Sequence, residues 1–276
     1  MSGRSSPTFR KRRLGRKLKA LRERAGLTLD DAAPLLDKTR TSLHRIEIGE
    51  TLADVHLVRS MMDVYDHYEP GLIDLARDAA KKSWLRSFDV SDQGYVDMET
   101  EAGRVLDFQI ISIPGLLQTK DYMRAQFSGW YLPTRRSADH VTVRLKRQER
   151  LTDEENQLHL HAIVDESSLR RVVGGHDVMR TQLRHLVTMA DLPTVLLQVF
   201  PAGQGAHTAM SGAFTLLTFP EPDDPEMMYI EHPTGSVHIE EIEKVREAKL
   251  IFKHLSATAL PPAESVRLIE QVFTEL

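Results

Sequence analysis

Polar and basic residues alternate with apolar ones between residues 40 and 46, in a pattern that could contact an anion. Leu43 and Ile46 are three residues apart, so a helix would turn both toward the same side. The opposite side would carry four polar residues: Arg40, Thr41, His44 and Arg45. The fork of an arginine side chain fits the two acceptors of guanine in the major groove of DNA. The segment therefore predicts either a helix that reads bases or a solvated basic face on a helical bundle.

Two short helices must position this surface. Thr28 and Thr39 each precede an amphipathic run, and a threonine oxygen at that place caps the first turn of a helix. We expect helices over 28–36 and 39–49 with a turn near 37–38 between them, which is helix-turn-helix geometry. Backbone N–H groups at the start of the second helix would face phosphate. Pro34 lies within the first helix, so we expect that helix to bend or to begin one turn late.

Charge is distributed unevenly along the chain. Residues 1–26 contain ten Lys/Arg and one acidic residue, a net +9 in a chain whose formal net charge is −4. Residues 1–12 are polar and basic, and we expect a flexible basic arm there. Arg10, Arg12 and Arg13 are its expected phosphate contacts. A basic head on an acidic body indicates an anionic partner, either nucleic acid or an anionic membrane.

The hydrophobic pattern changes after about residue 85. Before it, apolar stripes such as Leu14, Leu18 and Leu21 predict five short helices between 13 and 85. After it, six apolar runs predict strands: 105–113, 158–164, 194–200, 214–219, 228–231 and 236–240. Five helical patterns lie among them: 119–127, 139–151, 176–190, 241–257 and 263–274. The expected fold class is therefore mixed, an all-α five-helix helix-turn-helix domain (13–82), a linker (83–100) and an α+β domain (101–276).

Several residue pairs could carry other chemistry, and we favour a structural interpretation for each. The chain has no cysteine, which excludes thiol nucleophiles and cysteine-ligated metals. His159 and His161 share one face of a strand, but no third ligand has an obvious spacing. Gly203 and Gly205 make only half of a dinucleotide fingerprint, and Asp165 is better explained as a helix cap. We therefore expect no catalytic residues, no metal and no cofactor.

Residues 13–68 resemble the Xre/Cro-type helix-turn-helix family of bacterial and phage repressors. The matching motifs are Leu14-Gly15, Leu21–Thr28 and Ile46–Gly49. This resemblance implies that Arg40, Thr41 and Arg45 face bases, with His44 beside them, and that Thr39 and Thr28 contact phosphate. It also implies an ion pair between Arg22 and Glu47 that joins the first and third helices.

Residues 95–273 resemble the domain of unknown function that is fused to such a head in the WhiJ-like group of actinomycete regulators. The matching motifs include Pro114–Tyr122, Arg144–Gln148, Asp165–Arg171 and Gln182–Leu186. The resemblance implies a small partner protein encoded by a neighbouring gene, and some such pairs are toxin–antitoxin-like. We expect three apolar residues to form the partner-binding surface: Leu116, Leu117 and Tyr122.

Together these patterns predict a sequence-specific DNA-binding transcriptional regulator that is cytoplasmic, associated with the nucleoid and not an enzyme. Its expected partners are double-stranded DNA and a second copy of itself, because one recognition helix reads few bases. No apolar run is long enough to cross a membrane. Two alternatives remain for the second domain: an antitoxin-like interaction module with autoregulatory DNA binding, or a sensor of a small molecule.

Overall fold

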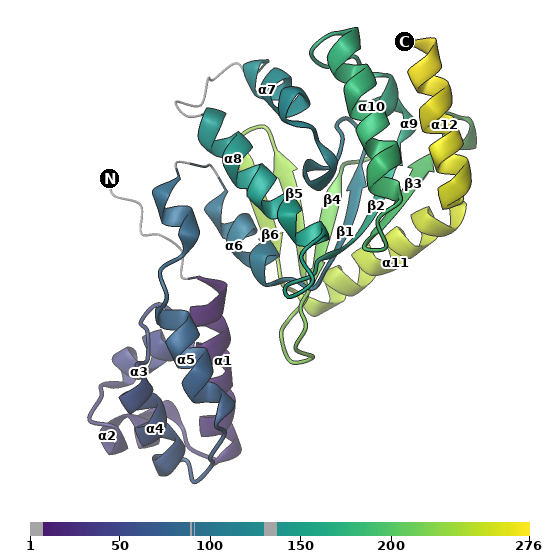
Figure 1. Cartoon of the computed structure of the whole chain (residues 1–276). Coiled ribbons are helices and arrows are strands. Elements are labelled where there is room, and N and C mark those ends of the chain that lie inside the picture. Colours follow the sequence, from purple (N-terminus) through teal and green to yellow (C-terminus); the bar gives the residue numbers. More distant parts are fainter. Residues whose placement is uncertain (1–7, 89, 91, 130–136) are drawn as a thin grey trace. The chain divides into compact units, whose positions relative to one another are not determined.

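The computed structural model describes residues 8–88, 90, 92–129 and 137–276, and the chain divides into two compact units, residues 1–86 and 87–276. The described part of the first unit is helical, and the second is built on a six-stranded sheet with helices around it (Figure 1). The expected fold class, a helical helix-turn-helix domain followed by an α+β domain, is confirmed. The boundary lies near residue 86, so the expected linker 83–100 is divided between the units.

The helices of the first unit pack around one apolar core. They are α1 (Phe9–Arg24), α2 (Leu29–Leu35), α3 (Arg40–Glu47), α4 (Val55–Val64) and α5 (Gly71–Ala80). The short 3-10 turn η1 (Trp84–Ser87) follows them and spans the point in the chain where the two units divide. Leu14, Leu18 and Leu21 from α1 meet Leu43 and Ile46 from α3 in this core. The i, i+4, i+7 spacing of the three leucines places them on one side of α1, which is why the sequence pattern located this helix.

Helix α1 begins four residues earlier than expected. Phe9 is buried, and Thr8 before it has the extended backbone of a helix-capping position. The first turns also pack against the turn after α3, because a Cβ on Gly49 would lie 2.7 Å from Cα of Arg12. The expected flexible arm is therefore wrong for residues 9–12: Arg10 and Arg12 lie on a packed helix. Residues 1–7 of that arm lie outside the described residues.

Helix α2 begins directly after its threonine cap and ends one residue beyond Pro34. The expected late start is therefore wrong, and Pro34 lies in the last turn of the helix. Asp37, with a φ of 52°, provides the reversal into the next helix. Helix α5 likewise ends at Ala80, earlier than the expected continuation to residue 85, because Lys81 has an extended backbone.

The second unit is a mixed sheet in the order β3-β2-β1-β4-β5-β6. Its strands are β1 (Arg104–Gln109), β2 (His159–Asp165), β3 (Val195–Phe200), β4 (Phe214–Thr218), β5 (Met227–His232) and β6 (Gly235–Ile239). β1, β2 and β3 are parallel, whereas β4, β5 and β6 continue the sheet from β1 in antiparallel pairs. All six expected strands are present, with ends shifted by up to four residues.

The two faces of the sheet are covered differently (Figure 1). Phe108 and Ile163 on one face pack against Val245 and Phe252 of α11. The other face carries Asp107 and is covered by helices from several segments. The helices of this unit are α6 (Gln93–Glu101), α7 (Lys120–Ser128), α8 (Ser137–Gln148), α9 (Glu166–Arg170), α10 (His176–Ala190), α11 (Ile242–Thr258) and α12 (Pro262–Glu275), with short turns η2 (Gly115–Leu117), η3 (Glu149–Leu151) and η4 (Ala202–Gln204).

Helix α6 occupies most of the segment that we expected to be a linker. Its sequence is polar and contains a glycine, so it carries a weak helical pattern. The helix forms because Asp92 accepts a hydrogen bond from the Tyr95 N–H at 3.0 Å and because Tyr95, Val96 and Met98 are buried. Burial of this kind depends on the rest of the domain, and the local pattern does not reveal it.

The crossing of α1 over α3 provides a direct test of the packing of the helical first unit (the head). A Cβ on Gly15 would lie 2.4 Å from the Glu47 carbonyl oxygen and 2.6 Å from that of Ile46, and both are backbone atoms that cannot move aside cheaply. We expect Gly15→Ala to reduce the free energy of unfolding of the head by about 1–3 kcal/mol or more. Thermal or urea unfolding followed by circular dichroism measures this loss.

Gly71→Ala is the matched control, because nothing lies within 4 Å of its added Cβ at the start of α5. It should be neutral or stabilise the head by up to about 1 kcal/mol, since alanine loses less backbone entropy on folding. Equal stability of the two variants would contradict the close α1–α3 crossing.

Candidate nucleic-acid interface and the pockets of the second domain

Two threonine caps set where α2 and α3 begin. Thr28 Oγ1 accepts the Asp31 N–H at 3.2 Å, and the Asp31 carboxylate accepts the Thr28 N–H at 3.0 Å. Thr39 Oγ1 accepts the Ser42 N–H at 3.1 Å. Each cap satisfies backbone donors that the helix itself leaves open. The caps therefore define the turn between the helices and the first exposed turn of α3.

Helix α3 is amphipathic in the way its sequence predicts. Leu43 and Ile46 are 0% and 3% exposed, and they anchor the helix in the core. The four expected base-reading residues, Arg40, Thr41, His44 and Arg45, are all exposed. The structure therefore brings these four side chains together on one solvent-facing surface of α3.

Both arginines on this surface form ion pairs with acids that the sequence patterns did not single out. Nε of Arg40 lies 3.4 Å from Oδ1 of Asp30, and Nε of Arg45 lies 3.1 Å from Oε2 of Glu50. The arginine side chains are 63% and 53% exposed. Such exposed pairs contribute about 0–1 kcal/mol, so separating the arginines from these carboxylates costs little.

A buried ion pair holds the base of α3. Nε and Nη2 of Arg22 donate to the two carboxylate oxygens of Glu47 at 2.6 and 2.8 Å, and Nη1 donates to the Leu27 carbonyl at 2.7 Å. The side chains are 7% and 2% exposed. The hydrogen bond to Glu47 raises the pKa of Arg22, against the effect of burial. The structure thus contains the expected pair, and it links α1, the last residue of α3 and the residue before the Thr28 cap.

The residues expected to contact phosphate differ in their surroundings. Arg10, Arg12 and Arg13 are half-buried on the first turns of α1. The Thr28 hydroxyl donates to Asp31 at 2.5 Å and already accepts its N–H, so a phosphate contact there would have to break this arrangement. The geometry of Thr39 is compatible with the expected phosphate contact, because its hydroxyl oxygen accepts the Ser42 N–H and its hydroxyl proton remains able to donate.

The expected partner-binding surface is wrong. Leu116, Leu117 and Tyr122 are 2%, 0% and 0% exposed. Gln182 explains this burial: its amide nitrogen donates to the Leu117 carbonyl at 2.7 Å, and its amide oxygen accepts the Thr119 N–H at 2.7 Å. These bonds hold the η2 turn against α10, so the two leucines fill the core and offer no surface to a partner.

A buried polar network lies on the helix-covered face of the sheet. Arg147 of α8 donates to both carboxylate oxygens of Glu99 at 2.6 and 2.5 Å, and the Tyr95 hydroxyl donates to Glu99 at 2.7 Å. Burial opposes the charge of Arg147, yet Glu99 outweighs it and raises the pKa of Arg147. The Arg147 and Glu99 side chains are 12% and 2% exposed, so this pair ties α6 to α8 with little contact with bulk water.

Two charged groups beside this pair, Arg144 and Asp107, form no ion pair with any other residue that the structure describes. Arg144 Nη1 donates to the amide oxygen of Gln118 at 2.6 Å, and burial lowers the pKa of Arg144 to about 10. Asp107 accepts hydrogen bonds from Gln109 and Thr215 at 2.8 and 2.9 Å, and burial raises its pKa to about 6. Both line a polar cavity of about 110 Å³, which is smaller than an ordinary ligand pocket.

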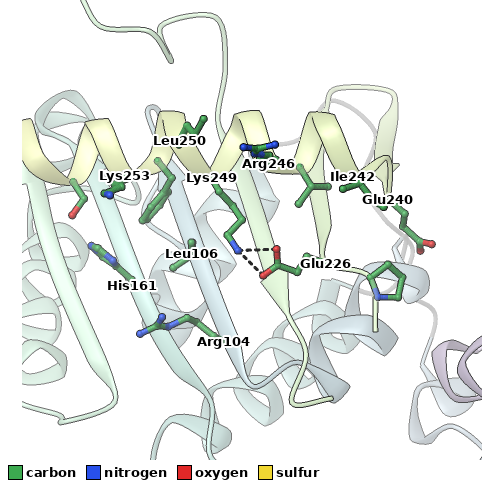
Figure 2. Close-up of a pocket in the computed structure, with 14 residues that line it drawn as sticks. Arg104, Leu106, His161, Glu226, Glu240, Ile242, Arg246, Lys249, Leu250 and Lys253 are labelled. Carbon is green, nitrogen blue, oxygen red and sulfur yellow. Dashed lines mark hydrogen bonds and ion pairs between the residues drawn. The ribbon is translucent and has the colours of Figure 1, made fainter. Parts of the chain in front are cut away.

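A larger pocket of about 660 Å³ lies between α11 and the opposite face of the sheet (Figure 2). Leu106, Phe252 and Val245 contribute apolar surface, and Arg104, Arg246, Lys249 and Lys253 contribute positive charge. The sequence patterns did not single out this pocket. The basic residues 246, 249 and 253 share one side of a helix, and such a basic stripe could have indicated a binding site. The strand residues that complete the pocket are more than 80 positions away in the sequence.

The residues weighed for other chemistry have structural roles. Ring nitrogen Nε2 of His161 is 2.8 Å from the Gln198 amide oxygen, and burial lowers the pKa of His161. Asp165 caps α9 by accepting the Ser167 N–H at 2.8 Å. Among the described residues no group of three or more His, Asp or Glu side chains is placed to hold a metal ion. None of the helices in the described part of the chain is long and apolar enough to cross a membrane.

The capped helix pair with its exposed basic surface defines a helix-turn-helix DNA-binding module joined to an α+β domain. Residues 13–72 match the family described as Helix-turn-helix domain, and residues 93–271 match the family described as Domain of unknown function (DUF5753). The second match covers well over half of the chain, so the protein belongs to the DUF5753 family. No curated protein and no solved structure matches the chain.

The buried ion pair of the head generates the next prediction. Glu47→Gln removes the buried carboxylate and leaves the Arg22 guanidinium with only the exposed Glu23 carboxylate, 3.7 Å from Nη2, which should cost about 3 kcal/mol of unfolding free energy. Asp74→Asn is the matched control, because it removes the exposed Asp74–Arg77 pair and should cost less than about 1 kcal/mol. Urea unfolding of both variants tests this, and a Glu47→Gln loss as small as that of the control would contradict it.

Asp107 generates a prediction about pH. Its folded pKa of about 6 exceeds the ordinary value of 3.8, so the folded domain binds the proton more tightly than the unfolded chain does. Ionisation therefore removes stability as pH rises from about 4 to about 6, by up to about 3 kcal/mol. Asp107→Asn should stabilise the domain above pH 6 and change little below pH 4.

Unfolding of the sheet domain as a function of pH measures this difference. Asp121→Asn is the control, because Asp121 lies exposed on α7 in a pair with Arg124. A pH-independent difference between Asp107→Asn and the unmodified protein would contradict the assignment.

Proposed function

We propose that the protein is a sequence-specific DNA-binding transcriptional regulator whose α3 reads bases in the major groove. The observation that carries this proposal is the capped, exposed α3 surface with two arginines at its front and a buried ion pair at its base. Arg40 and Arg45 are the proposed readers of guanine, with Thr41 and His44 between them. Thr39 and the N–H groups at the start of α3 are the proposed phosphate contacts.

A homodimer is the proposed DNA-binding form. A single recognition helix contacts few base pairs, and two copies placed on half-sites about one helical turn apart supply the missing specificity. The second domain has 19 Lys/Arg and 28 Asp/Glu between residues 83 and 276, a net −9. A charge of this sign repels phosphate, so we propose that the second domain holds the dimer and receives a signal, and does not itself contact DNA.

Two signals remain as proposals for the second domain. The resemblance to WhiJ-like regulators supports a small partner protein from a neighbouring gene, with autoregulatory, antitoxin-like DNA binding. The pocket beside α11 supports a small molecule instead, because its volume lies in the range of about 300–1,000 Å³ that is usual for ligands. A protein of this kind acts on chromosomal DNA, so a cytoplasmic, nucleoid-associated location follows from the proposal.

Selection of bound sequences from random DNA provides the operator for the test. Arg40→Ala and Arg45→Ala should each reduce binding to that operator by about 1–3 kcal/mol more than binding to random DNA, because a bidentate contact to guanine discriminates between bases. The selected sequence should contain two half-sites about one helical turn apart. Fluorescence anisotropy on both DNAs measures the two affinities.

Arg77→Ala is the control, because Arg77 lies exposed on α5 in a pair with Asp74. It should change operator and random binding by the same small amount. Equal losses on operator and random DNA for Arg45→Ala would contradict the base-reading role and reduce this residue to a phosphate contact.

A further inference from the structure

The pocket beside α11 has the shape and lining of a ligand site. It lies between one side of α11 and the strand residues Arg104, Leu106 and His161 (Figure 2). We propose that it binds a small amphipathic molecule with an apolar body and an anionic end group, of the chemical class of a medium-chain carboxylate. The inference deepens the proposed function by naming the class of signal, but ligand binding itself does not depend on DNA binding.

The apolar body of the ligand would contact side chains that are now exposed or half-covered. Leu250 and Ile242 on α11 are 62% and 76% exposed, although both are large and apolar. Leu106 is half-buried beneath them, and Phe252 and Val245 close the interior side of the pocket. Removing apolar surface from water is favourable, so covering these exposed side chains would contribute to the free energy of ligand binding.

The anionic end group would meet cations that form no ion pair within the described part of the chain. Among the described residues, Arg104, Arg246 and Lys253 have no carboxylate within ion-pair distance. They stand out because the domain as a whole is acidic. Figure 2 shows Arg104 and Lys253 toward one end of the pocket, and Glu226 and Glu240 toward the other. This separation of charge orients a ligand with one negative end.

The pocket is held open by contacts that do not need a ligand. Lys249 Nζ donates to both carboxylate oxygens of Glu226 at 2.8 Å, which ties α11 to the start of β5. The Thr218 hydroxyl donates to the same carboxylate at 3.0 Å. The His161 ring stands edge-on to the Phe252 ring, with centroids 4.9 Å apart, and a burial-lowered pKa keeps it neutral near pH 7. Arg104 and Lys253 therefore supply the charge at that end.

Isothermal titration calorimetry on the full chain tests the proposal with three probes of equal chain length: decanoate, 1-decanol and decyltrimethylammonium. We expect decanoate to bind about tenfold or more tightly than 1-decanol, because hydrogen bonds to a charged group add to the shared apolar contact. Decyltrimethylammonium should bind most weakly, because the free charges of the pocket are positive.

Variants separate the charge of the pocket from its apolar surface. Arg104→Gln combined with Lys253→Gln should remove most of the preference for decanoate over 1-decanol while leaving binding of 1-decanol unchanged. Leu250→Asp should abolish decanoate binding, and its side chain is exposed enough for the fold to tolerate the change. Lys244→Gln is the matched control, because Lys244 lies on α11 in a pair with Glu241 and does not line the pocket.

Three outcomes would overturn the proposal. These are no binding by any probe, equal binding of decanoate and 1-decanol, and a dimer that dissociates with Leu250→Asp while the unmodified chain ignores decanoate. The last would identify this surface as an interface between copies. Operator affinity with and without decanoate is measured separately, so absence of DNA binding would count against the proposed function and leave the titration result standing.

Discussion

The buried pair between Arg22 and Glu47 is the interaction on which the head depends. It joins the end of α1 to the end of α3 and, through the Leu27 carbonyl, to the residue before the cap of α2. Burying two charged side chains costs free energy unless each is paired and hydrogen-bonded. The relative position of the two helices that carry Arg22 and Glu47 is therefore closely restricted. The orientation of α3, and with it the exposed position of Arg40 and Arg45, follows from that geometry.

The sheet domain uses its two faces for different chemistry. The face under α6 and α8 buries charge, with Glu99 and Arg147 paired tightly and Asp107 held where ionisation is unfavourable. The face under α11 is apolar at its centre and positively charged at one end of its pocket. A buried polar network has few alternative arrangements, whereas an open apolar pocket can accept a ligand. The polar face under α6 and α8 supports the domain, and the face under α11 is the one that we propose binds a ligand.

These two modules fit the proposed regulator, in which ligand binding at one site would change the affinity for DNA at the other. A ligand shifts DNA affinity only by its differential affinity for two arrangements of the protein. The exposed ion pairs of Arg40 and Arg45 are weak, so the DNA contacts proposed for these two side chains would require no costly rearrangement. For the proposed homodimer, control of the spacing between two heads by the second domain would be a physically economical means of regulation.

Most elements, and the exposed basic surface of α3, could be predicted from the sequence, because their signals are local. Thr28 and Thr39 cap helices within three residues of themselves, and the six apolar runs that become strands are recognisable without knowledge of their neighbours. The early start of α1, helix α6, the burial of Leu117 and the pocket beside α11 could not. Each depends on residues distant in the chain, as when Gln182 holds the Leu117 carbonyl from 65 positions away. Only packing of the whole chain determines which apolar residues are covered and which charges remain without a partner.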